Sequence, residues 1–521
     1  MADRDNKTSP STGSTDEPRT WRSIDELERA PDFEEWLHRE FPREAAVWPD
    51  GVDRRSFLKL TGASLALGGL TACTRQPLEK IVPYTQQVEQ IVPGQPLFFA
   101  SSFPHDGYAT GILVESHMGR PTKIEGNPEH PASLGKSDAL SQAAILELYD
   151  PDRAKTVTEL GRIRTWDTFV DETRRAIQAL EAFDGARLRV LTETVTSPSL
   201  AAEIRRVLDA YPSARWVQYD PVGRDAARAA TTDAFGEAVS TRYELDKADV
   251  IVSLDSDFLT SGPGHLPYAK AFAARRRVRQ GHAEMNRLYA VETTPLATGT
   301  LADHRLAAST VEIGRVAAAL AAKLGVPGVQ PMNKTVGALA DWVGAVADDL
   351  EAHAGRSLVV AGEQLPVAVQ KLVLAINQHL GNLGETVVAT EPVEAEPTDQ
   401  TAALAELVKE MEAGEVDVLI ILGGNPIYNA PADLPIKEAI QKVSRRIRLG
   451  LYEDETSEYC QWHVPMAHFL ESWGDGRAFD GTVTLTQPLI EPLYSGKTAC
   501  ELLSVFGTEE PLDGETILKA Y

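Results

Sequence analysis

Short apolar runs, each followed by a polar loop, recur between residues 187 and 422. They cover Arg187–Leu191, Ala248–Leu254, Leu288–Glu292, Ser357–Ala361 and the residues from Val416 to Leu422. Runs of this length without alternation predict strands that are buried on both faces. Helical spacing follows several of them, for example from Ser199 to Ala210 and, after a turn at Gly362, as far as Leu380. Strand, polar loop and helix in repetition predict doubly wound α/β domains.

The region before these runs has a different pattern. Gly111–Ser116 is a strand-like run, Gly119 and Arg120 predict a turn, and Pro121–Glu125 predicts the returning strand. Gly126, Asn127 and Pro128 then end the sheet. We therefore expect a compact antiparallel β unit ahead of the α/β domains.

The start of the chain is polar. Residues 1–19 contain almost no apolar side chains, so they are predicted to be disordered. From Thr20 to Phe41, Trp, Ile, Leu and Phe recur at helical spacing, which predicts one or two short amphipathic helices. Such helices can bind an export chaperone or another partner, or they can belong to an extension that is cleaved and has no later role.

An export signal is predicted between Asp53 and Cys73. Arg54 and Arg55 stand side by side ahead of a short, weakly apolar segment that ends in Leu-Thr-Ala-Cys. The apolar segment is too short to span a bilayer, which takes about 20 residues. The order matches a twin-arginine signal followed by a lipobox, so we expect export and lipidation of Cys73. Chance occurrence, or a buried Cys73 in a core helix, is the alternative.

Composition limits the classes of function. The chain has 521 residues with 43% hydrophobic content, enough for several cored domains. Its 51 Lys and Arg against 76 Asp and Glu argue against a nucleic-acid partner. Three cysteines exclude a disulfide framework and a four-cysteine iron–sulfur site within this chain.

Three segments resemble the molybdopterin oxidoreductase family. They are GRPTKIEGNPEHP (119–131), LYDPDR (148–153) and RTWDTFVDETRRAI (164–177), in the family's order. The resemblance implies a small β-rich first domain and two Rossmann-like α/β domains that hold two pterin guanine dinucleotides around a metal. The expected organisation begins with an extended, partly disordered region (1–52), the export signal (53–73) and an extended linker (74–97). The β-rich domain I (98–165), the α/β domain II (166–350) and the α/β domain III (351–455) follow. A return segment (456–521) ends the chain.

The sequence departs from the catalytic members of this family. Where they carry a cluster cysteine in a Gly-Lys-x-Cys context, this chain has Gly135, Lys136, Ser137 and Asp138. A carboxylate is a poor substitute for a thiolate at iron. No cysteine lies between Cys73 and Cys460 to bind molybdenum. We therefore expect no metal and no cofactor in this chain, with bis-molybdopterin guanine dinucleotide as the alternative.

Remnants of a pterin pocket would lie at the carboxyl ends of the predicted strands. Candidates after two of these strands are Asp255, Asp257 and Thr294, together with Glu292, Thr298 and Asp303. Helix capping is the favoured interpretation, because no Gly-rich phosphate fingerprint accompanies them. Gly423, Gly424 and Asn425 follow the last strand, and amides freed by two glycines can receive a phosphate or a neighbouring loop.

The last segment, WHVPMAHFLESWGDG (462–476), resembles the part of the family in which the chain returns to the cofactor. For His463 and His468, core or surface hydrogen bonding is favoured over metal binding, because no third ligand lies at zinc spacing. Because the sequence ends at Tyr521, the family's fourth domain is expected to be missing from it. A fragment or a split-gene product is therefore expected.

Taken together, the late twin-arginine signal, the lipobox, the EKIVPY linker (79–84) and the cysteine-poor domains resemble the molybdopterin-like subunits of the alternative complex III family. This resemblance implies a non-catalytic subunit on the periplasmic face of the membrane, where quinol is oxidised. Implied partners are a multihaem cytochrome, iron–sulfur and quinol-binding membrane subunits and the twin-arginine translocase. Haem and iron–sulfur clusters are expected in those partners or in a missing C-terminal half. A molybdenum or tungsten pterin reductase and an exported binding lipoprotein are the alternatives.

Overall fold

The computed structural model describes residues 91–521 except 182–183, 280, 282–283 and 331–337. The predictions for residues 1–90, which include Arg54, Arg55, Cys73 and most of the linker, lie outside the described residues. Residues 88–521 group together as one unit. Across the described part of this unit, none of the helices has the length and apolar character needed to cross a bilayer.

The predicted β unit is confirmed. Strands β1 (Leu97–His105), β2 (Tyr108–His117) and β3 (Arg120–Gly126) form an antiparallel sheet, with Val114 opposite Ile124. Helix α5 (Ala139–Leu148) covers the apolar face of this sheet. The C-terminal hairpin of β17 (Gly474–Arg477) and β18 (Val483–Thr486) packs on β1 and β2, so the two ends of the described chain build one domain.

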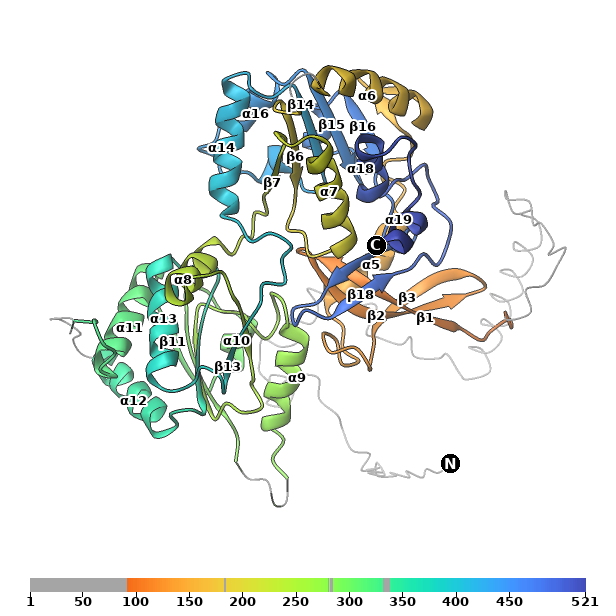
Figure 1. The fold of residues 1–521 in the computed structure, drawn as a ribbon. Helices are drawn as coiled ribbons and strands as arrows, with labels where there is room; N and C mark the ends of the chain where they lie inside the picture. The colour runs from red at the N-terminus through yellow and green to blue at the C-terminus, as the bar shows by residue number, and fades with distance from the viewer. Residues whose placement is uncertain (1–90, 182–183, 280, 282–283, 331–337) are drawn as a thin grey trace, which may run out of the picture. The chain divides into compact units, whose positions relative to one another are not determined.

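A seven-stranded sheet forms the core of the first α/β domain (Figure 1). Its order is β5 (Arg162–Ile163), β4 (Thr158–Glu159), β16 (Trp462–Pro465), β15 (Arg445–Gly450), β14 (Val418–Leu422), β6 (Leu188–Thr192) and β7 (Arg215–Gln218). Helices α6 (Trp166–Glu181), α7 (Pro198–Ala210) and α18 (Ala499–Gly507) contribute to the core on one face. Helices α14 (Gln400–Glu412) and α16 (Ile436–Ile440) cover the other.

A four-stranded parallel sheet forms the second α/β domain. Its order is β11 (His304–Ala307), β10 (Arg287–Glu292), β9 (Val250–Leu254) and β12 (Ser357–Ala361). Helices α11 (Thr310–Lys323), α12 (Ala338–Ala352) and α13 (Val367–His379) cover one face, and α9 (His265–Arg275) covers the other. Helix α8 (Asp225–Phe235) packs on α13, and β8 (Ser240–Tyr243) pairs with β13 (Val387–Thr390). The short helices are α10 (Ala297–Thr300), α15 (Pro426–Asn429), α17 (Glu455–Glu458) and α19 (Gly514–Ala520).

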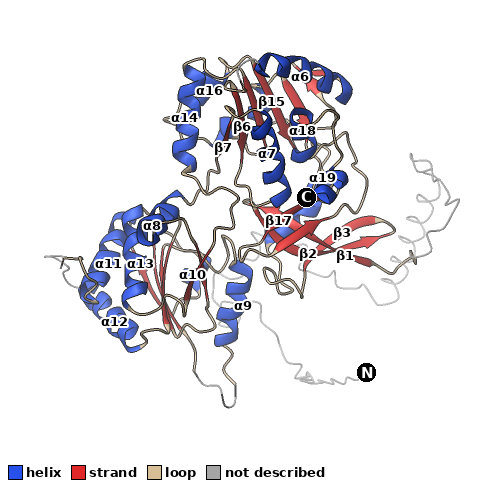
Figure 2. Ribbon diagram, in the orientation of Figure 1, coloured by secondary structure: helices blue, strands red, loops and turns tan. Residues whose placement is uncertain are grey.

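Both α/β sheets have helices on both faces, as Figure 2 shows. All residues of β6, β9 and β14 are buried, so apolar side chains are favourable on either face of each strand. The predicted strands at 187–191, 248–254, 288–292, 357–361 and 416–422 are confirmed within one or two residues. The doubly wound α/β class is therefore confirmed.

The two sheets interleave along the chain. The chain leaves the seven-stranded sheet after β7, builds the four-stranded sheet from β9 to β12 and returns at β14. Consequently, each of the ranges 166–350 and 351–455 contributes strands to both sheets. Sheet membership depends on pairing between strands that are distant in the sequence, which the apolar pattern of one strand does not encode.

Candidate functional site

The described chain has a polar junction where its three domains meet, centred on α8. Arg224 precedes α8, and its guanidinium group lies 4.7 Å from the ring centroid of Tyr108 in β2. Its Nη1 donates to the Tyr108 hydroxyl (2.5 Å), and its Nε lies 2.8 Å from Glu363 Oε1, after β12. Burial raises the pKa of Tyr108 to about 12, so the phenol stays protonated at neutral pH. These contacts connect the β-rich domain to the four-stranded domain.

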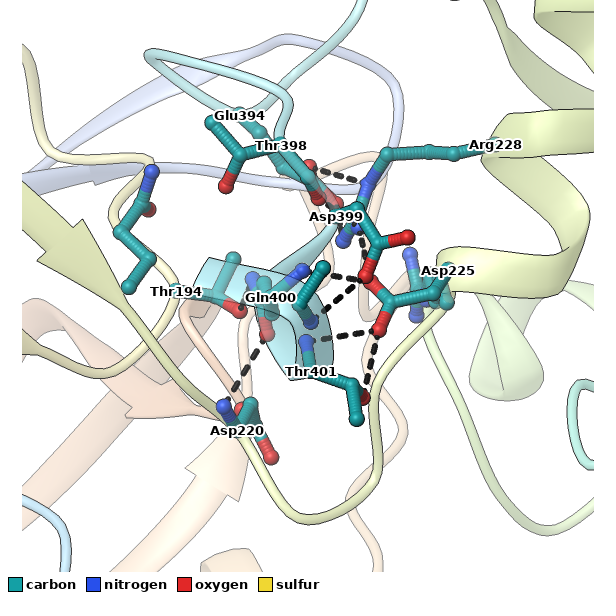
Figure 3. Close-up of polar contacts among 12 residues, drawn as sticks. Thr194, Asp220, Asp225, Arg228, Glu394, Thr398, Asp399, Gln400 and Thr401 are labelled. Carbon is teal, nitrogen blue, oxygen red and sulfur yellow. Dashed lines mark hydrogen bonds and ion pairs between the residues drawn. The ribbon is translucent and has the colours of Figure 1, made fainter. Parts of the chain in front are cut away.

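The second arginine of α8 continues this junction towards the seven-stranded domain (Figure 3). Arg228 Nε and Nη2 donate to the two oxygens of Glu394, at 2.9 and 3.2 Å. Its Nη1 also donates to Asp225 Oδ1 (2.8 Å). Both arginines of the junction therefore already have carboxylate partners.

Asp225 anchors the start of α14. Its carboxylate accepts from the amides of Gln400 and Thr401, both at 3.0 Å, and from the Thr401 hydroxyl (2.8 Å). Burial favours the neutral acid, but these donors lower the pKa of Asp225 below its usual value. Gln400 in turn donates to Thr194 Oγ1 after β6 and accepts from the Asp220 amide after β7. A charge on α8 thus fixes the chain's return to the seven-stranded sheet.

A cavity of about 470 Å³ lies beside this junction. Its walls come from the carboxyl ends of β9 and β12, the first half of α8, the β1–β2 turn and the segment around 392–397. Its charged lining residues are Asp106, Asp220, Asp257, Glu363, Glu394, Arg224 and Arg228. Ligands of open α/β sheets bind beyond the carboxyl ends of strands, so this cavity is the candidate site of the chain.

Of the candidates Asp255, Asp257 and Thr294 in the four-stranded domain, only Asp257 lines the cavity. Asp255 accepts from the Thr293 amide (2.8 Å) and from Gln364 Nε2 (3.2 Å), and thereby joins the loops after β9, β10 and β12. Asp257 accepts from the Thr298 amide (2.8 Å) and lines the cavity. Thr294 is exposed and is not part of the cavity lining.

Helix capping, the favoured interpretation of the predicted polar residues, applies to Asp257 but not to Asp255. In the described helices, the N-cap positions of α9 and α10 are Gly264 and Leu296. Asp257 accepts from the amide of Thr298 in the first turn of α10, whereas Asp255 accepts from the Thr293 amide and from Gln364, both on neighbouring loops. The preference for capping rested on local sequence, whereas parallel strands bring together loops that are far apart in the chain.

The glycine turn after β14 is occupied by the chain's own groups. A Cβ atom on Gly423 would lie 2.7 Å from Glu193 Oε2, and one on Gly424 would lie 3.2 Å from Glu193 Cγ. Arg448 Nη1 donates to the Gly423 carbonyl (2.6 Å). Asn425 Nδ2 donates to Glu455 Oε2 (2.7 Å). Of the two predicted occupants of this turn, the structure therefore shows the neighbouring loop, with Glu193 from the end of β6.

Asp138, which stands where the family's cluster cysteine is expected, has a different role. It caps α5 by accepting from the Ser141 amide (2.7 Å), and its Oδ2 lies 3.1 Å from His265 Nε2 at the start of α9. The ion pair with His265 lowers the pKa of Asp138 well below its usual range. His265 Nδ1 lies 2.8 Å from the Gly262 carbonyl, so both ring nitrogens face acceptors and the imidazolium form is favoured. This position therefore connects two domains through an ion pair.

The two conspicuous histidines of the return segment are both buried, but the favoured interpretation, hydrogen bonding, applies only to His468, since neither ring nitrogen of His463 has a partner among the described residues. His463 is 4% exposed and His468 is 3% exposed. His468 Nδ1 accepts from the Leu470 amide (3.2 Å). Cys460 is also buried, and burial raises the pKa of its thiol to about 12, which disfavours the thiolate that metals bind.

These observations do not fit a pterin dinucleotide. Its pyrophosphates require free amides or cations, but the cavity has five carboxylates, and both its guanidinium groups are paired with carboxylates. The two-glycine turn faces Glu193. Within the described ranges, no three His, Cys, Asp or Glu side chains are arranged to hold a metal ion.

The fold is that of the molybdopterin oxidoreductases, and the predicted resemblance is confirmed at this level. The chain superposes on acetylene hydratase from Pelobacter acetylenicus with a TM-score of 0.58 and 12% identity, covering 78% of this chain and 69% of that one. No family model matches the sequence.

Sequence comparison gives two named relatives. The first is the menaquinone reductase, molybdopterin-binding-like subunit, of Nitratidesulfovibrio vulgaris, which is 22% identical over 504 residues, covering 89% of this chain and 72% of the relative. The second is the assimilatory nitrate reductase catalytic subunit of Bacillus subtilis, 24% identical over 106 residues, or 20% of this chain and 15% of the relative.

Sequence reasoning missed most of the junction. No recognisable motif contains its residues, which are Tyr108, Arg224, Arg228, Glu363 and Glu394. Two of them, Tyr108 and Glu394, are 286 positions apart. One signal was available: Asp220 and Glu193 follow β7 and β6, two neighbouring parallel strands, and polar residues near ligands gather at the carboxyl ends of such strands.

Proposed function

We propose that this chain is a non-catalytic structural subunit of a membrane-anchored respiratory complex of the alternative complex III type, in which electrons from quinol pass to a cytochrome or oxidase. The observation that carries this proposal is the similarity over 89% of the chain to a subunit that is itself named molybdopterin-binding-like and belongs to a menaquinone reductase. The proposed partners are a multihaem cytochrome and iron–sulfur and quinol-binding membrane subunits.

Three features of the described residues support a structural role. Asp138 is used for a helix cap and an ion pair. Glu193 occupies the glycine turn. The junction around Arg224 and Arg228 joins three domains through the chain's own charges. In this proposal, the fold is retained as a rigid platform for neighbouring subunits.

A second candidate is a molybdenum- or tungsten-pterin reductase. The similarity to acetylene hydratase and to a nitrate reductase catalytic subunit favours it. The two candidates differ in a property that can be measured directly, because only the enzyme requires a bound metal and pterin.

The proposed function predicts the composition of the natively purified chain. We expect molybdenum, tungsten and released pterin each below 0.1 per chain, on the order of background, with haem- and cluster-bearing subunits in the same preparation. Elemental analysis and pterin fluorescence measure this, with a catalytic molybdopterin enzyme purified in parallel as the control. About one metal and two pterin groups per chain would contradict the structural role and support the reductase.

We also propose that the chain is exported and anchored by a lipid on Cys73. Cys73→Ser is expected to move the exported protein from the membrane fraction to the soluble periplasmic fraction in a strain that lacks the partner subunits. Arg54→Lys together with Arg55→Lys is the control, which should retain the precursor in the cytoplasm. Membrane retention of Cys73→Ser without partners would contradict the lipid anchor.

A further inference from the structure

The cavity beside α8 is acidic and has aromatic walls. Five aromatic rings line it, those of Tyr108, Tyr243, Phe258, Tyr268 and Phe479. Tyr268 lies at the centre of this aromatic wall, with ring centroids 5.6 Å from both Tyr243 and Phe479. Five carboxylates against two guanidinium groups leave an excess of three negative charges around the same space. Aromatic faces and carboxylates both attract cations.

Part of the excess charge lies on Asp220, which has no cationic group within ion-pair distance among the described residues. The cavity's arginines are bound to Glu363, Glu394 and Asp225. Asp220 is only 9% exposed and lines the cavity, yet its side chain accepts a single hydrogen bond, from the Val222 amide at 3.1 Å. Within the described part of the chain, it forms no ion pair. Burial and the nearby charge of Asp106 raise the pKa of Asp220 above its usual value, against the opposing effects of the Val222 amide, Arg224 and His105.

A buried carboxylate without a counter-ion is unfavourable, because its charge is desolvated and not compensated. A cation in the cavity would remove this cost. Asp106 lines the same space, and its side chain is about half exposed at 49%, so it is accessible to an incoming ligand. Asp220 and Asp106 therefore place two carboxylates on one cavity, although Asp106 Oδ2 also lies 3.4 Å from His105 Nε2.

The cavity itself indicates which kind of cation fits. The described acidic and histidine side chains are not close enough to hold a metal ion in groups of three. The chain's own Arg224 shows the alternative, since its guanidinium group lies over the Tyr108 ring and beside Glu363. A volume of about 470 Å³ is within the range of small-molecule sites, roughly 300–1,000 Å³.

We propose that this cavity binds an organic cation, a guanidinium or alkylammonium group, with Asp220 and Asp106 as its counter-ions and the tyrosine faces as its walls. The group is either a free small molecule or the tip of a basic side chain from a partner. This inference goes beyond the proposed function and does not depend on it, because a ligand can be bound by either a structural subunit or an enzyme.

Calorimetric titration of the full chain with agmatine at low ionic strength tests the proposal. Asp220→Asn keeps the shape of the side chain and the acceptor for the Val222 amide but removes the charge, so agmatine affinity is expected to fall about tenfold or more. Asp106→Asn is expected to weaken binding less, because its carboxylate is more exposed. Asp348→Asn, at a side chain 72% exposed on α12, is the matched control and should leave the affinity unchanged.

Titration with guanosine diphosphate tests whether the cavity binds an anionic ligand and not a cation. We expect it to give no binding heat in wild-type protein, since its phosphates would meet uncompensated carboxylates. Equal agmatine affinity in wild type and Asp220→Asn would overturn the proposal. So would binding of guanosine diphosphate together with a lack of response to agmatine. A second titration, with an acetylated arginine amide, identifies the source of the cation. If this compound binds more tightly than agmatine, the cation is a side chain of a partner protein. If agmatine binds more tightly, the cation is a free small molecule.

Discussion

Replacing Arg153 by Met is expected to destabilise the chain by about 3–5 kcal/mol, which is typical when one partner of a buried ion pair is removed. Arg153 and Glu471 pair through both guanidinium nitrogens, at 2.6 and 3.1 Å, and their side chains are 1% and 0% exposed. The amides of His468 and Leu493 also donate to Glu471. Loss of Arg153 therefore leaves a buried carboxylate with amide donors but without its counter-ion.

The unfolding midpoint in urea measures this effect, and the double variant Arg153→Met/Glu471→Met tests its cause. Removing both charges should recover part of the loss, because two apolar side chains of similar length can fill the same space, although the amides of His468 and Leu493 then lose their acceptor. The control is Arg164→Met. Arg164 pairs with Glu159 at a side-chain exposure of 39%, and the expected change is below about 1 kcal/mol. If the double variant is no more stable than Arg153→Met, uncompensated charge is not the reason for the loss.

This ion pair also explains why two distant motifs occur together. Arg153 ends the LYDPDR segment, and Glu471 belongs to the return segment, 318 positions later. The pair fixes the returning chain against the end of α5, since Arg153 Nη1 also donates to the Leu148 carbonyl (2.8 Å). The resemblance identified both segments from sequence, but the bond between them is visible only in the fold.

Much of the fold could be predicted because its signals are local. Strands such as β9 and β14 are buried on both faces, and their sequences are therefore continuous apolar runs. The β2–β3 hairpin was predictable from its turn, where Gly119 has a φ of 79° that favours glycine. The sequence near a strand does not show which sheet the strand joins. For example, β6 and β14 pair directly although about 230 residues separate them.

The site was less predictable for the same reason. Asp255 and Asp257 were found because they closely follow a strand, but their partners lie elsewhere in the chain, on the loop after β10 and in helix α10. Glu193 could not be assigned to the glycine turn, because nothing near Gly423 in the sequence points to it. The junction of Arg228 with Glu394 depends on a helix and a linker 166 residues apart. Charges paired over such distances leave no periodic trace in the sequence.

Two buried histidines should make the fold sensitive to mild acid. Burial lowers the pKa of His463 and of His468 to about 4, and neighbouring arginines, Arg448 and Arg153 respectively, act in the same direction. The carboxylates of Asp454 and Glu471 oppose this shift without cancelling it. Among the described residues, neither ring nitrogen of His463 has a hydrogen-bond partner. Both imidazoles are therefore neutral in the folded chain at pH 7.

The direction of the pH effect follows from these values. An unfolded histidine has a pKa of about 6.5, so between pH 6.5 and 4 the unfolded chain binds more protons than the folded chain. The contribution of the two neutral histidines to the free energy of unfolding is therefore fully present above about pH 6.5. It is lost as the pH drops towards 4. One pKa unit corresponds to about 1.4 kcal/mol, which gives a loss of about 3 kcal/mol for each histidine.

Urea unfolding midpoints at pH 7, 6, 5 and 4.5 test this expectation. His463→Leu removes one titrating group, and His468→Asn removes the other while keeping an acceptor for the Leu470 amide. The double variant should lose less stability than wild type between pH 6.5 and 4.5, whereas His379→Asn, at an exposed position of α13, should follow wild type. His265 works in the opposite direction, because the Asp138 ion pair and the Gly262 carbonyl outweigh burial and raise its pKa, so its contribution is lost as pH rises. If the wild-type and double-variant profiles run parallel through this window, the acid sensitivity does not come from the buried histidines.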